Sequence, residues 1–521
     1  MSDPGRDAGS DGRAPLILAV LLPALLAAGL AAYRLSSRSL WLDEGASIAI
    51  ASQHGAALWR GIRHDGGNML AYYLLLHLLV DWFGSALWVV RLPSVLADAA
   101  TAGLTALLAW SLVGRHRVAL SAGLLCAVSL PLVFWGQDAR GYALMVTLAT
   151  GSLLSFTVLV QSRGPAPRPA TVAFLLLSLL SIYVGFYAAL IILAELAVLP
   201  LFRHRARLVG ACLLLVAVGC VPLGVLAVQR GSGQLFWVGS LTPATVGQAG
   251  AVLISTGLPP NFHVTAITIV ASAVTIVVAA ALGIRLAMAQ PQLRRLASPG
   301  EPARSATWIA ASWLLVPLVV MLAAAGAGEP VELPRAAILL IPAVGLVLAW
   351  GLDLPGRLRA LGLGAVALLL VMRALVLAPT YRATPENWQA AAVHVAASSR
   401  SGDCILFYPQ DGRMPFDYYL RNRPAAGRLT PVLPTAPWEV TRPYVEQYSA
   451  PSPIRLRQIE LSCPGLWVVA SHQGRSHGPP ASKRDLKRYR ALLSRLTRAY
   501  RHRRSSRFGY AARIYVTRFW R

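Results

Sequence analysis

The chain has 521 residues, of which 56% are hydrophobic and only 13% are charged. An average soluble domain is about 25% charged, so this composition excludes an ordinary soluble protein. The formal net charge is +26, and much of it lies in short loops between apolar runs and in the last forty residues. The basic loops are typical of membrane proteins rather than of nucleic-acid-binding proteins. We therefore expect contact with membrane lipids and no nucleic-acid partner.

About eleven apolar runs approach the length needed to cross roughly 30 Å of hydrocarbon as a helix. In chain order they are Leu16–Tyr33, Trp88–Val113, Val118–Trp135, Tyr142–Val160, Ala170–Tyr183, Tyr187–Leu201, Leu208–Val228, Val264–Ile284, Ala306–Ala325, Ala336–Trp350 and Ala360–Leu377. The first run is long for a signal peptide and no clean small-residue cleavage site follows it, so we interpret it as a span. Met69–Phe83 is also apolar but has only about fifteen residues, which predicts an interfacial helix on the outer leaflet.

The distribution of arginine predicts the side of the membrane that each loop faces. With a cytoplasmic N-terminus, every loop on the inner side is rich in arginine; these loops are 115–117, 161–169, 203–207, 285–304 and 353–359. This arrangement satisfies the positive-inside rule. An odd number of spans then places the chain after Thr380 outside the cytoplasm.

These features predict an all-α polytopic protein of the plasma (inner) membrane, with a transmembrane domain at 1–379 that includes a first outer loop at 36–87. The segment 380–521 has the pattern of a soluble extracytoplasmic α/β domain. Its expected elements are buried strands at Cys404–Tyr408 and Leu466–Val469, a basic amphipathic helix at Lys483–Tyr500 and a final strand at Ala512–Phe519. The basic residues of this tail could bind anionic lipid headgroups or a charged polymer, or form the solvated face of a helix, which is the simpler interpretation.

The cysteines show no spacing typical of a metal site. We expect no cofactor, and a divalent metal is a possibility that no ligand cluster in the sequence supports. Cys404 and Cys463 each precede a predicted strand outside the cytoplasm, where a disulfide between them is permitted. Two free thiols are the alternative.

Two adjacent carboxylates, Asp43 and Glu44, follow the first span beside Trp41. One of them could act as a general base toward a hydroxyl. Alternatively, Asp43 caps a helix at Ala46–Ala57 and Glu44 favours its dipole. The residues alone leave both interpretations open.

Later in the same loop, His64 and the pair Tyr72 and Tyr73 could form a polar and aromatic platform for a sugar. An ordinary turn followed by interfacial aromatic anchors is the simpler interpretation. Arg91, at the mouth of the second span, could hold a lipid phosphate or extend toward the interface.

The second outer loop crowds Asp138, Arg140 and Tyr142 into a short turn, a mixture that favours contacts to phosphate and hydroxyl groups over a pair that only closes the turn. Tyr187 and Arg335 lie in or next to later outer loops, and Arg335 could clamp a phosphate or anchor the interface. The topology gathers all of these side chains on one side of the membrane. The candidate substrate-binding residues are His64, Tyr72, Tyr73, Arg91, Arg140, Tyr142, Tyr187 and Arg335.

Four motifs in this order resemble a known group: Trp-Leu-Asp-Glu at 41–44, Tyr-Tyr-Leu-Leu-Leu-His at 72–77, Arg-Leu-Pro-Ser at 91–94 and Gln-Asp-Ala-Arg-Gly-Tyr at 137–142. Together they resemble the GT-C glycosyltransferases of the protein mannosyltransferase and aminoarabinose transferase type, including the bacterial Rgt-like branch. The resemblance extends into the tail through Glu386-Asn387-Trp388. Departures from the usual pattern are Gly66-Gly67-Asn68 and Leu333-Pro334-Arg335-Ala336.

This resemblance implies the GT-C fold and an inverting transfer of a sugar from a polyprenyl-phosphate donor to a lipid, glycan or protein acceptor outside the cytoplasm. It also implies that Asp43 is the catalytic base with Glu44 beside it, that Asp138 is a second acid that shapes the site, and that Arg140 and Arg335 stabilise the phosphate leaving group.

Two other classes of function fit a polytopic membrane protein. A transporter or flippase of lipid-linked sugars usually shows inverted repeats and broken helices at mid-membrane, whereas this chain shows no repeat and its polar candidates cluster at the outer rim. A non-catalytic scaffold would not need Asp43, Asp138 and Arg335 together.

Overall fold

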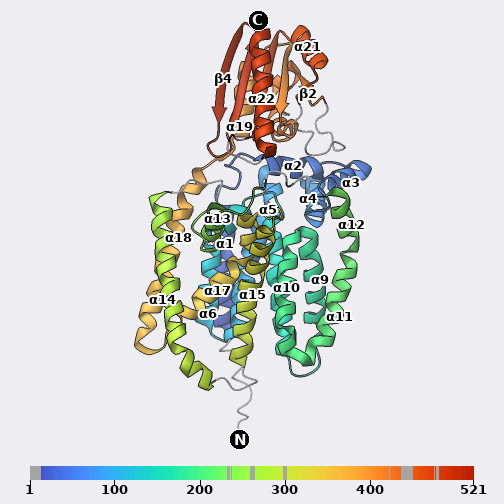
Figure 1. Ribbon diagram of the computed structural model, residues 1–521. Helices are drawn as coiled ribbons and strands as arrows, with labels where there is room; N and C mark the ends of the chain where they lie inside the picture. The colour runs from blue at the N-terminus through green and yellow to red at the C-terminus, as the bar shows by residue number, and fades with distance from the viewer. Residues whose placement is uncertain are drawn as a thin grey trace.

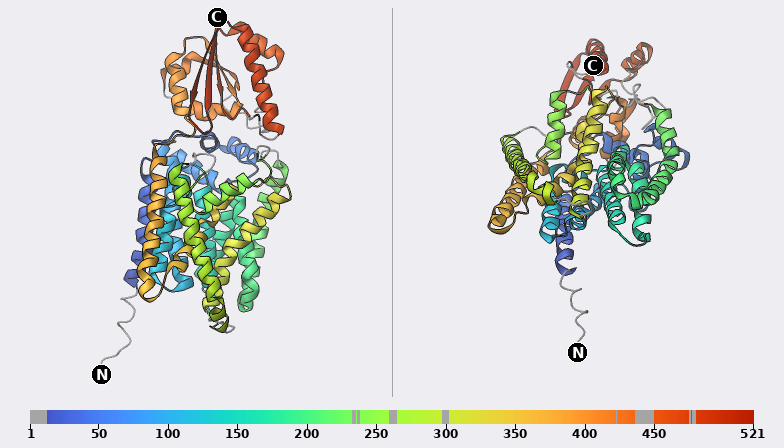
Figure 2. Two further views of the ribbon diagram at one scale, coloured as in Figure 1. Left: turned by 60° about the vertical axis from the view of Figure 1, so that its left-hand side comes forward. Right: turned by 60° about the horizontal axis from the view of Figure 1, so that its bottom comes forward.

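The computed structural model describes residues 13–231, 235, 238–258, 265–296, 302–421, 423–435, 450–474, 476 and 480–521. A bundle of helices forms one end of the molecule and a smaller domain with a β-sheet forms the other (Figure 1). The helix α1 begins at the end of the bundle far from the sheet domain, as both views in Figure 2 show. Val264 and parts of the expected loops 229–263 and 285–304 lie outside the described residues.

The bundle is built from long apolar helices joined by short connections. Its helices are α1 (Arg13–Ala32), α5 (Leu87–Val113), α6 (His116–Ala127), α7 (Leu130–Gly136), α8 (Tyr142–Gln161), α9 (Arg168–Val184), α10 (Ala189–Val198), α11 (Arg203–Gly219), α12 (Val221–Arg230), α13 (Pro243–Leu253), α14 (Ala266–Leu296), α15 (Pro302–Gly326), α16 (Leu333–Ala336), α17 (Ile341–Leu352) and α18 (Arg359–Leu377).

Eight helices in the described part of the chain are long and apolar enough to cross a membrane, and α6 with α7 adds a ninth span if this pair, bent by 62°, counts as one. The chain is therefore a multi-pass membrane protein. Two of the eleven expected spans account for the difference. The helix α9 has only 17 residues. The continuous helical stretch Phe186–Gly219 counts once by length, but it turns back at Leu199–Phe202. The hydroxyl of Tyr183, at the end of α9, donates to the carbonyl of Gly219 at 2.7 Å, so α10 and α11 run in opposite directions as two of the expected runs.

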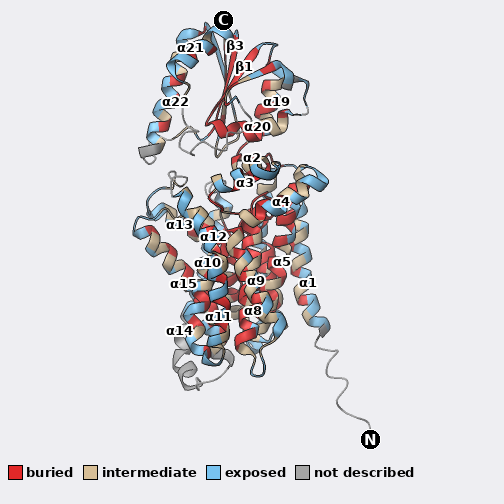
Figure 3. Ribbon diagram, turned by 90° about the vertical axis from the view of Figure 1, so that its right-hand side faces the viewer, coloured by how far each residue is buried: buried red, intermediate tan, exposed pale blue. Residues whose placement is uncertain are grey.

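Three short helices, α2 (Leu42–Ala51), α3 (Gly55–His64) and α4 (Leu70–Phe83), lie between the bundle and the sheet domain (Figure 3). The expected short helix is α4, and its 14 residues are too few to span a membrane. One side of α4 is buried, including Tyr72 and Tyr73, whereas Trp82 and Phe83 are exposed. This two-sided character fits a helix that lies along a membrane interface.

Buried polar side chains inside the bundle are tied to neighbouring helices. The hydroxyl of Ser152 donates a hydrogen bond to Glu195 Oε1 at 2.9 Å, which gives one oxygen of this buried carboxyl group a partner and lowers the cost of burying it. Among the described residues Asp98 forms no ion pair, because the guanidinium of Arg91 contacts a different carboxylate.

The C-terminal domain contains a five-stranded sheet in the order β2-β1-β3-β5-β4. Its strands are β1 (Asp403–Tyr408), β2 (Leu429–Leu433), β3 (Gly465–Ala470), β4 (His502–Phe508) and β5 (Ile514–Trp520), and its helices are α19 (Trp388–Ser398), α20 (Arg413–Leu420), α21 (Pro453–Ser462) and α22 (Pro480–Ala499). The strand β1 pairs in parallel with β2 and β3, whereas β5 pairs antiparallel with β3 and β4. The helices α19 and α20 cover one face and α21 and α22 the other, so every residue of β1 and β3 is buried.

The expected α/β character of this domain is confirmed, with two additions. These are the strands β2 and β4, which were not predicted. The predicted basic amphipathic helix is α22: its Leu492 and Leu496 are buried, whereas its Lys487 and Arg490 are exposed. A disulfide joins Cys404 to Cys463. It ties the start of β1 to the loop that leads into β3.

Candidate active site

Asp43 lies in the first turn of α2, and its carboxylate faces two arginines. Its Oδ2 is 3.4 Å from Nη1 of Arg335 and 3.9 Å from Nη2 of Arg140. The Asp43 side chain is 26% exposed. The helix-cap interpretation of Asp43 is wrong, because α2 begins at Leu42, before Asp43. The structure therefore joins a partly open carboxylate to two cations that come from distant parts of the chain.

Arg335 is held from several directions at the start of α16. Its Nε is 2.9 Å from Glu332 Oε2, its Nη1 donates to the hydroxyl of Tyr142 at 3.1 Å, and its guanidinium lies 5.3 Å from the ring centre of Trp41. Tyr187 reaches the same place, because its hydroxyl accepts a hydrogen bond from the backbone N–H of Glu332 at 3.2 Å. Burial raises the pKa of Glu332 to about 7, although the charge of Arg335 opposes this shift.

Arg140 connects Asp43 to α4. Its Nη1 donates to the hydroxyls of Ser47 at 3.2 Å and Tyr73 at 3.3 Å, and the hydroxyl of Tyr73 in turn donates to Asp65 Oδ2 at 2.7 Å. Burial raises the pKa of Asp65 to about 6, against the opposing charge of Arg140. Asp65 was not among the residues predicted from the sequence, where it is simply the neighbour of His64.

The expected aromatic platform does not form as an open surface. Tyr72 and Tyr73 are both fully buried, because they lie on the side of α4 that packs into the protein, so neither ring presents a free face to a sugar. His64 is half-buried, and burial, followed by the charge of Arg230, lowers the pKa of its imidazole to about 4. His64 is therefore neutral at physiological pH.

Glu44 differs from its neighbour Asp43, because it is fully buried in an ion pair with Arg91. Nε and Nη2 of Arg91 each lie 2.8 Å from a carboxylate oxygen of Glu44, and both side chains are 0% exposed. The same carboxylate accepts the backbone N–H of Ala139 at 2.9 Å. Burial opposes ionisation of Glu44, but the charge and hydrogen bonds of Arg91 outweigh it and lower the pKa of Glu44. In this arrangement Arg91 is not free to hold a lipid phosphate, contrary to the expectation, and Glu44 has no open oxygen for a substrate.

Asp138 is buried behind Asp43 rather than open to it. Its Oδ1 accepts the indole N–H of Trp41 at 2.8 Å. Burial and then the nearby charge of Glu44 raise the pKa of Asp138 well above its usual range. By accepting this indole N–H, Asp138 fixes the ring of Trp41, which lies against Arg335.

The C-terminal domain completes the surroundings of Asp43. Glu386 Oε2 accepts the backbone N–H of Leu42 at 2.9 Å, and Glu386 Oε1 is 3.3 Å from Nε2 of His472. Although burial opposes the imidazolium form, the charge of Glu386 raises the pKa of His472. Burial raises the pKa of the nearby Asp411 to about 7.

Gly45 shows how closely the C-terminal domain approaches α2. A Cβ atom at this position would lie 2.8 Å from Cδ of Pro415 in α20, a distance that no real side chain tolerates. The glycine after the carboxylate pair therefore permits the domain to dock on the helix that carries Asp43. The Glu386-Asn387-Trp388 motif was the one sequence signal of this contact.

Two solved structures cover nearly the whole chain. ArnT from Cupriavidus metallidurans in the apo state matches with a TM-score of 0.56 and 16% sequence identity. ArnT from the same organism bound to undecaprenyl phosphate matches with a TM-score of 0.58 and 15% sequence identity. Each match covers 96% of this chain and 97% of the ArnT chain. The chain has the GT-C fold. A weaker similarity, with a TM-score of 0.48 and 10% identity over 88% of this chain and 69% of the other, is to the archaeal oligosaccharyltransferase AglB from Archaeoglobus fulgidus. No protein-family model and no curated protein matches the chain.

One group of side chains on this GT-C fold has the donor set of a metal site. Among the described residues, His54, His77 and Asp81 bring one ligand atom each within 4.8 Å of one another, and the donor types suit zinc. His54 and Asp81 are exposed and 2.8 Å apart. None of the residues that surround Asp43 belongs to this group.

Proposed function

We propose that this protein is a glycosyltransferase that moves a sugar from a polyprenyl-phosphate donor to a hydroxyl group of a lipid, glycan or protein acceptor. The GT-C fold supports this proposal, as does the fact that the structurally similar ArnT was crystallised with undecaprenyl phosphate. The observation that carries it is the placement of the Asp43 carboxylate between the guanidinium groups of Arg335 and Arg140.

The two arginines supply the charge that a departing phosphate needs. A guanidinium offers several N–H donors in a fixed plane and suits phosphate oxygens. A donor phosphate that enters between Arg335 and Arg140 competes with Asp43 for these cations, so binding of the donor frees the carboxylate. The same contacts strengthen as negative charge develops on the leaving oxygen.

Asp43 then acts as the general base of a single displacement. An Oδ of Asp43 takes the proton of the acceptor hydroxyl, and the hydroxyl oxygen attacks the anomeric carbon from the face opposite the phosphate. The bond between that carbon and the phosphate oxygen breaks, and its electrons leave with the phosphate. The anomeric configuration is inverted.

Glu44, Arg91 and Asp138 act as positioning residues in this scheme. The buried pair of Glu44 and Arg91 fixes the first turn of α2 against α5, and the bond to the N–H of Ala139 fixes the turn that carries Arg140. Asp138 sets the ring of Trp41 beside Arg335. Removing any of them should disturb the distance between Asp43 and its arginines.

We also propose an orientation for the protein, which is supported by the place where two arginine-rich loops meet. Arg115 donates to Asp353 at 2.7 Å, so two of the loops expected inside lie at the same end of the bundle. The helix α5 starts just after Ser85, whose carbonyl contacts Tyr418 of the C-terminal domain, and runs for 27 residues toward Arg115, about 40 Å. The positive-inside rule then supports a cytoplasmic N-terminus and an extracytoplasmic C-terminal domain and active site.

The test uses full-length protein in liposomes, radiolabelled polyprenyl-phosphate sugars and membrane lipid extracts as acceptors. We expect Asp43→Asn to lower transfer by about 10²–10⁴-fold, the usual contribution of a general base, and the anomeric NMR signal of the product to show inversion. Asp353→Asn, at the other end of the bundle, is the matched control and should retain activity. Full transfer by Asp43→Asn would reject the mechanism. Movement of label across the bilayer without a new glycosidic bond would favour a flippase instead.

A further inference from the structure

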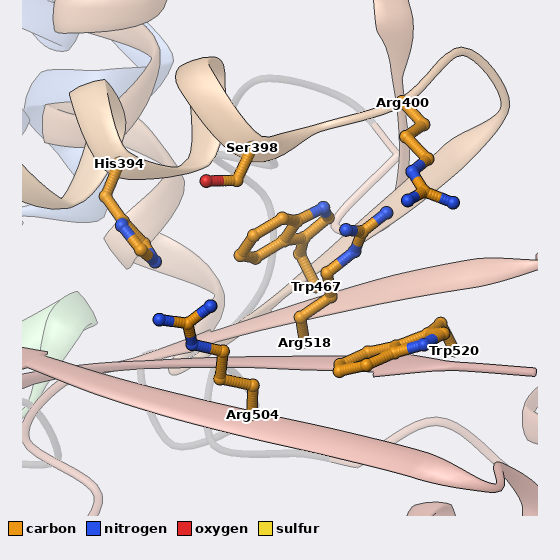
Figure 4. A pocket seen from close by; sticks show the side chains of 7 residues that line it. All are labelled: His394, Ser398, Arg400, Trp467, Arg504, Arg518 and Trp520. Carbon is orange, nitrogen blue, oxygen red and sulfur yellow. The ribbon is translucent and has the colours of Figure 1, made fainter.

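The C-terminal domain has a hollow of its own on the sheet face that α19 covers. It has a volume of about 190 Å³ and is lined by His394, Ser398, Arg400, Trp467, Arg504, Arg518 and Trp520 (Figure 4). None of these residues takes part in the site around Asp43. The hollow is smaller than the ~300–1,000 Å³ typical of drug-sized ligands, so it suits one ring with its substituents.

Strand register places the key side chains in one row. Trp467 on β3 lies opposite Arg518 on β5, and Arg518 lies opposite Arg504 on β4. Trp520 follows two residues after Arg518 and therefore points to the same face. Arg518 lies between the two indole rings, with its guanidinium 5.2 Å from the ring centre of Trp467 and 5.6 Å from that of Trp520.

The hollow is positively charged. Asp403 is buried beneath it, and its Oδ2 accepts from Arg518 Nη2 at 2.9 Å, the indole N–H of Trp467 at 3.0 Å and the backbone N–H of Arg400 at 3.0 Å. This acid fixes two of the lining side chains and offsets one charge. Within the described ranges, neither Arg400 nor Arg504 has an ion-pair partner, so an excess of positive charge faces the hollow.

Aromatic faces and unpaired arginines together define a class of ligand. One face of Trp520 stacks on the ring of His502, and its remaining surface in the hollow can pack against the C–H groups of a sugar ring, while Arg504 and Arg400 can donate to a carboxylate or phosphate. The hydroxyl group of Ser398 and the ring of His394 supply further polar contacts at the rim (Figure 4). The hollow thus combines indole rings with several guanidinium groups around it.

We propose that this hollow binds a single anionic sugar unit, one that carries a carboxylate or a phosphate. If the protein is the glycosyltransferase proposed above, such a unit would belong to its acceptor glycan, and the C-terminal domain would hold that glycan while another part of it reaches Asp43. Binding in the hollow itself does not depend on catalysis.

The test measures binding to the full-length protein in detergent by titration calorimetry, with glucuronic acid, glucose 1-phosphate, glucose and inorganic phosphate as probes. We expect both anionic sugars to bind at least about tenfold more tightly than glucose or phosphate alone, a difference of about 1.4 kcal/mol. Arg504→Gln and Trp520→Ala should each weaken that binding about tenfold or more, and high salt should weaken it further.

Arg507→Gln is the matched control, because Arg507 lies on the same strand as Arg504 but three residues away, on the opposite face. It removes the same charge and should leave binding unchanged. Equal binding of glucose, equal binding of phosphate alone, or an Arg504→Gln variant that binds like wild type would each overturn the proposal. Asp43→Asn should retain binding, so failure of the proposed catalytic role and failure of this hollow are distinguishable.

Discussion

The buried ion pair between Glu44 and Arg91 allows a prediction whose size follows from the structure. Arg91 contacts Glu44 through two bonds of 2.8 Å and also donates to the carbonyls of Leu35 at 2.6 Å and Arg38 at 3.1 Å. Arg91→Gln removes the charge and most of these bonds, and leaves a buried carboxylate that keeps only its backbone N–H partners and its hydrogen bond with Asp138. Loss of one partner from such a pair costs about 3–5 kcal/mol.

We therefore expect Arg91→Gln to lower the thermal unfolding temperature markedly. The double variant of Glu44→Gln with Arg91→Gln should recover part of the loss, because the buried charge of Glu44 is then removed as well. The assay follows the folded fraction of the detergent-purified protein by size-exclusion chromatography after heating. Arg63→Gln, an exposed arginine on α3, serves as control and should change stability by no more than about 0.5 kcal/mol.

One result would refute this reasoning. If Arg91→Gln unfolded at the wild-type temperature but required a much higher donor concentration for half-maximal transfer, Arg91 would contact the donor phosphate directly. The positioning role of the pair would then be wrong.

Two further predictions concern pH and oxidation. The folded-state pKa of Glu332 is raised to about 7 by burial, against the opposing charge of Arg335, so its contribution to stability is complete below about pH 4.5 and is lost as the pH rises through about 7. Glu332→Gln should flatten the pH dependence of the unfolding temperature in that window, and identical profiles for the two proteins would contradict the assignment. The disulfide between Cys404 and Cys463 spans 59 residues. Replacing both cysteines by alanine should destabilise the C-terminal domain by about 4 kcal/mol in the chain-entropy model. Limited proteolysis of this variant should then be faster than that of a Cys220→Ala control. Reactive thiols at both positions in the unreduced protein would reject the bond.

The long spans and the basic loops could be predicted because each is a local pattern. A run such as that of α8 is apolar over 20 residues, long enough to reveal a span by itself. The strand β4 could not be found in this way, because its sequence His-Arg-Arg-Ser-Ser-Arg-Phe has no apolar alternation. It is an edge strand, where charged residues are common.

The carboxylate pair shows where sequence reasoning about the site reached its limit. The two carboxylates are adjacent in the sequence, which does not show that one is buried and the other partly exposed. Adjacent residues on a helix point about 100° apart, so Glu44 faces Arg91 inside the protein while Asp43 faces Arg335. Those partners lie 47 and 292 residues away, and only the folded chain shows which carboxylate meets which arginine.

The hydrogen bond from the backbone of Leu42 to Glu386 joins groups 344 residues apart. During synthesis on the ribosome, the segment that becomes α2 emerges long before Glu386 has been added. A nascent chain in the membrane therefore already contains Asp43 but lacks the carboxylate that receives the first turn of its helix and the domain that docks on Gly45. The first turn of α2 thus gains its contacts with Glu386 and Pro415 only after the C-terminal domain has been translated.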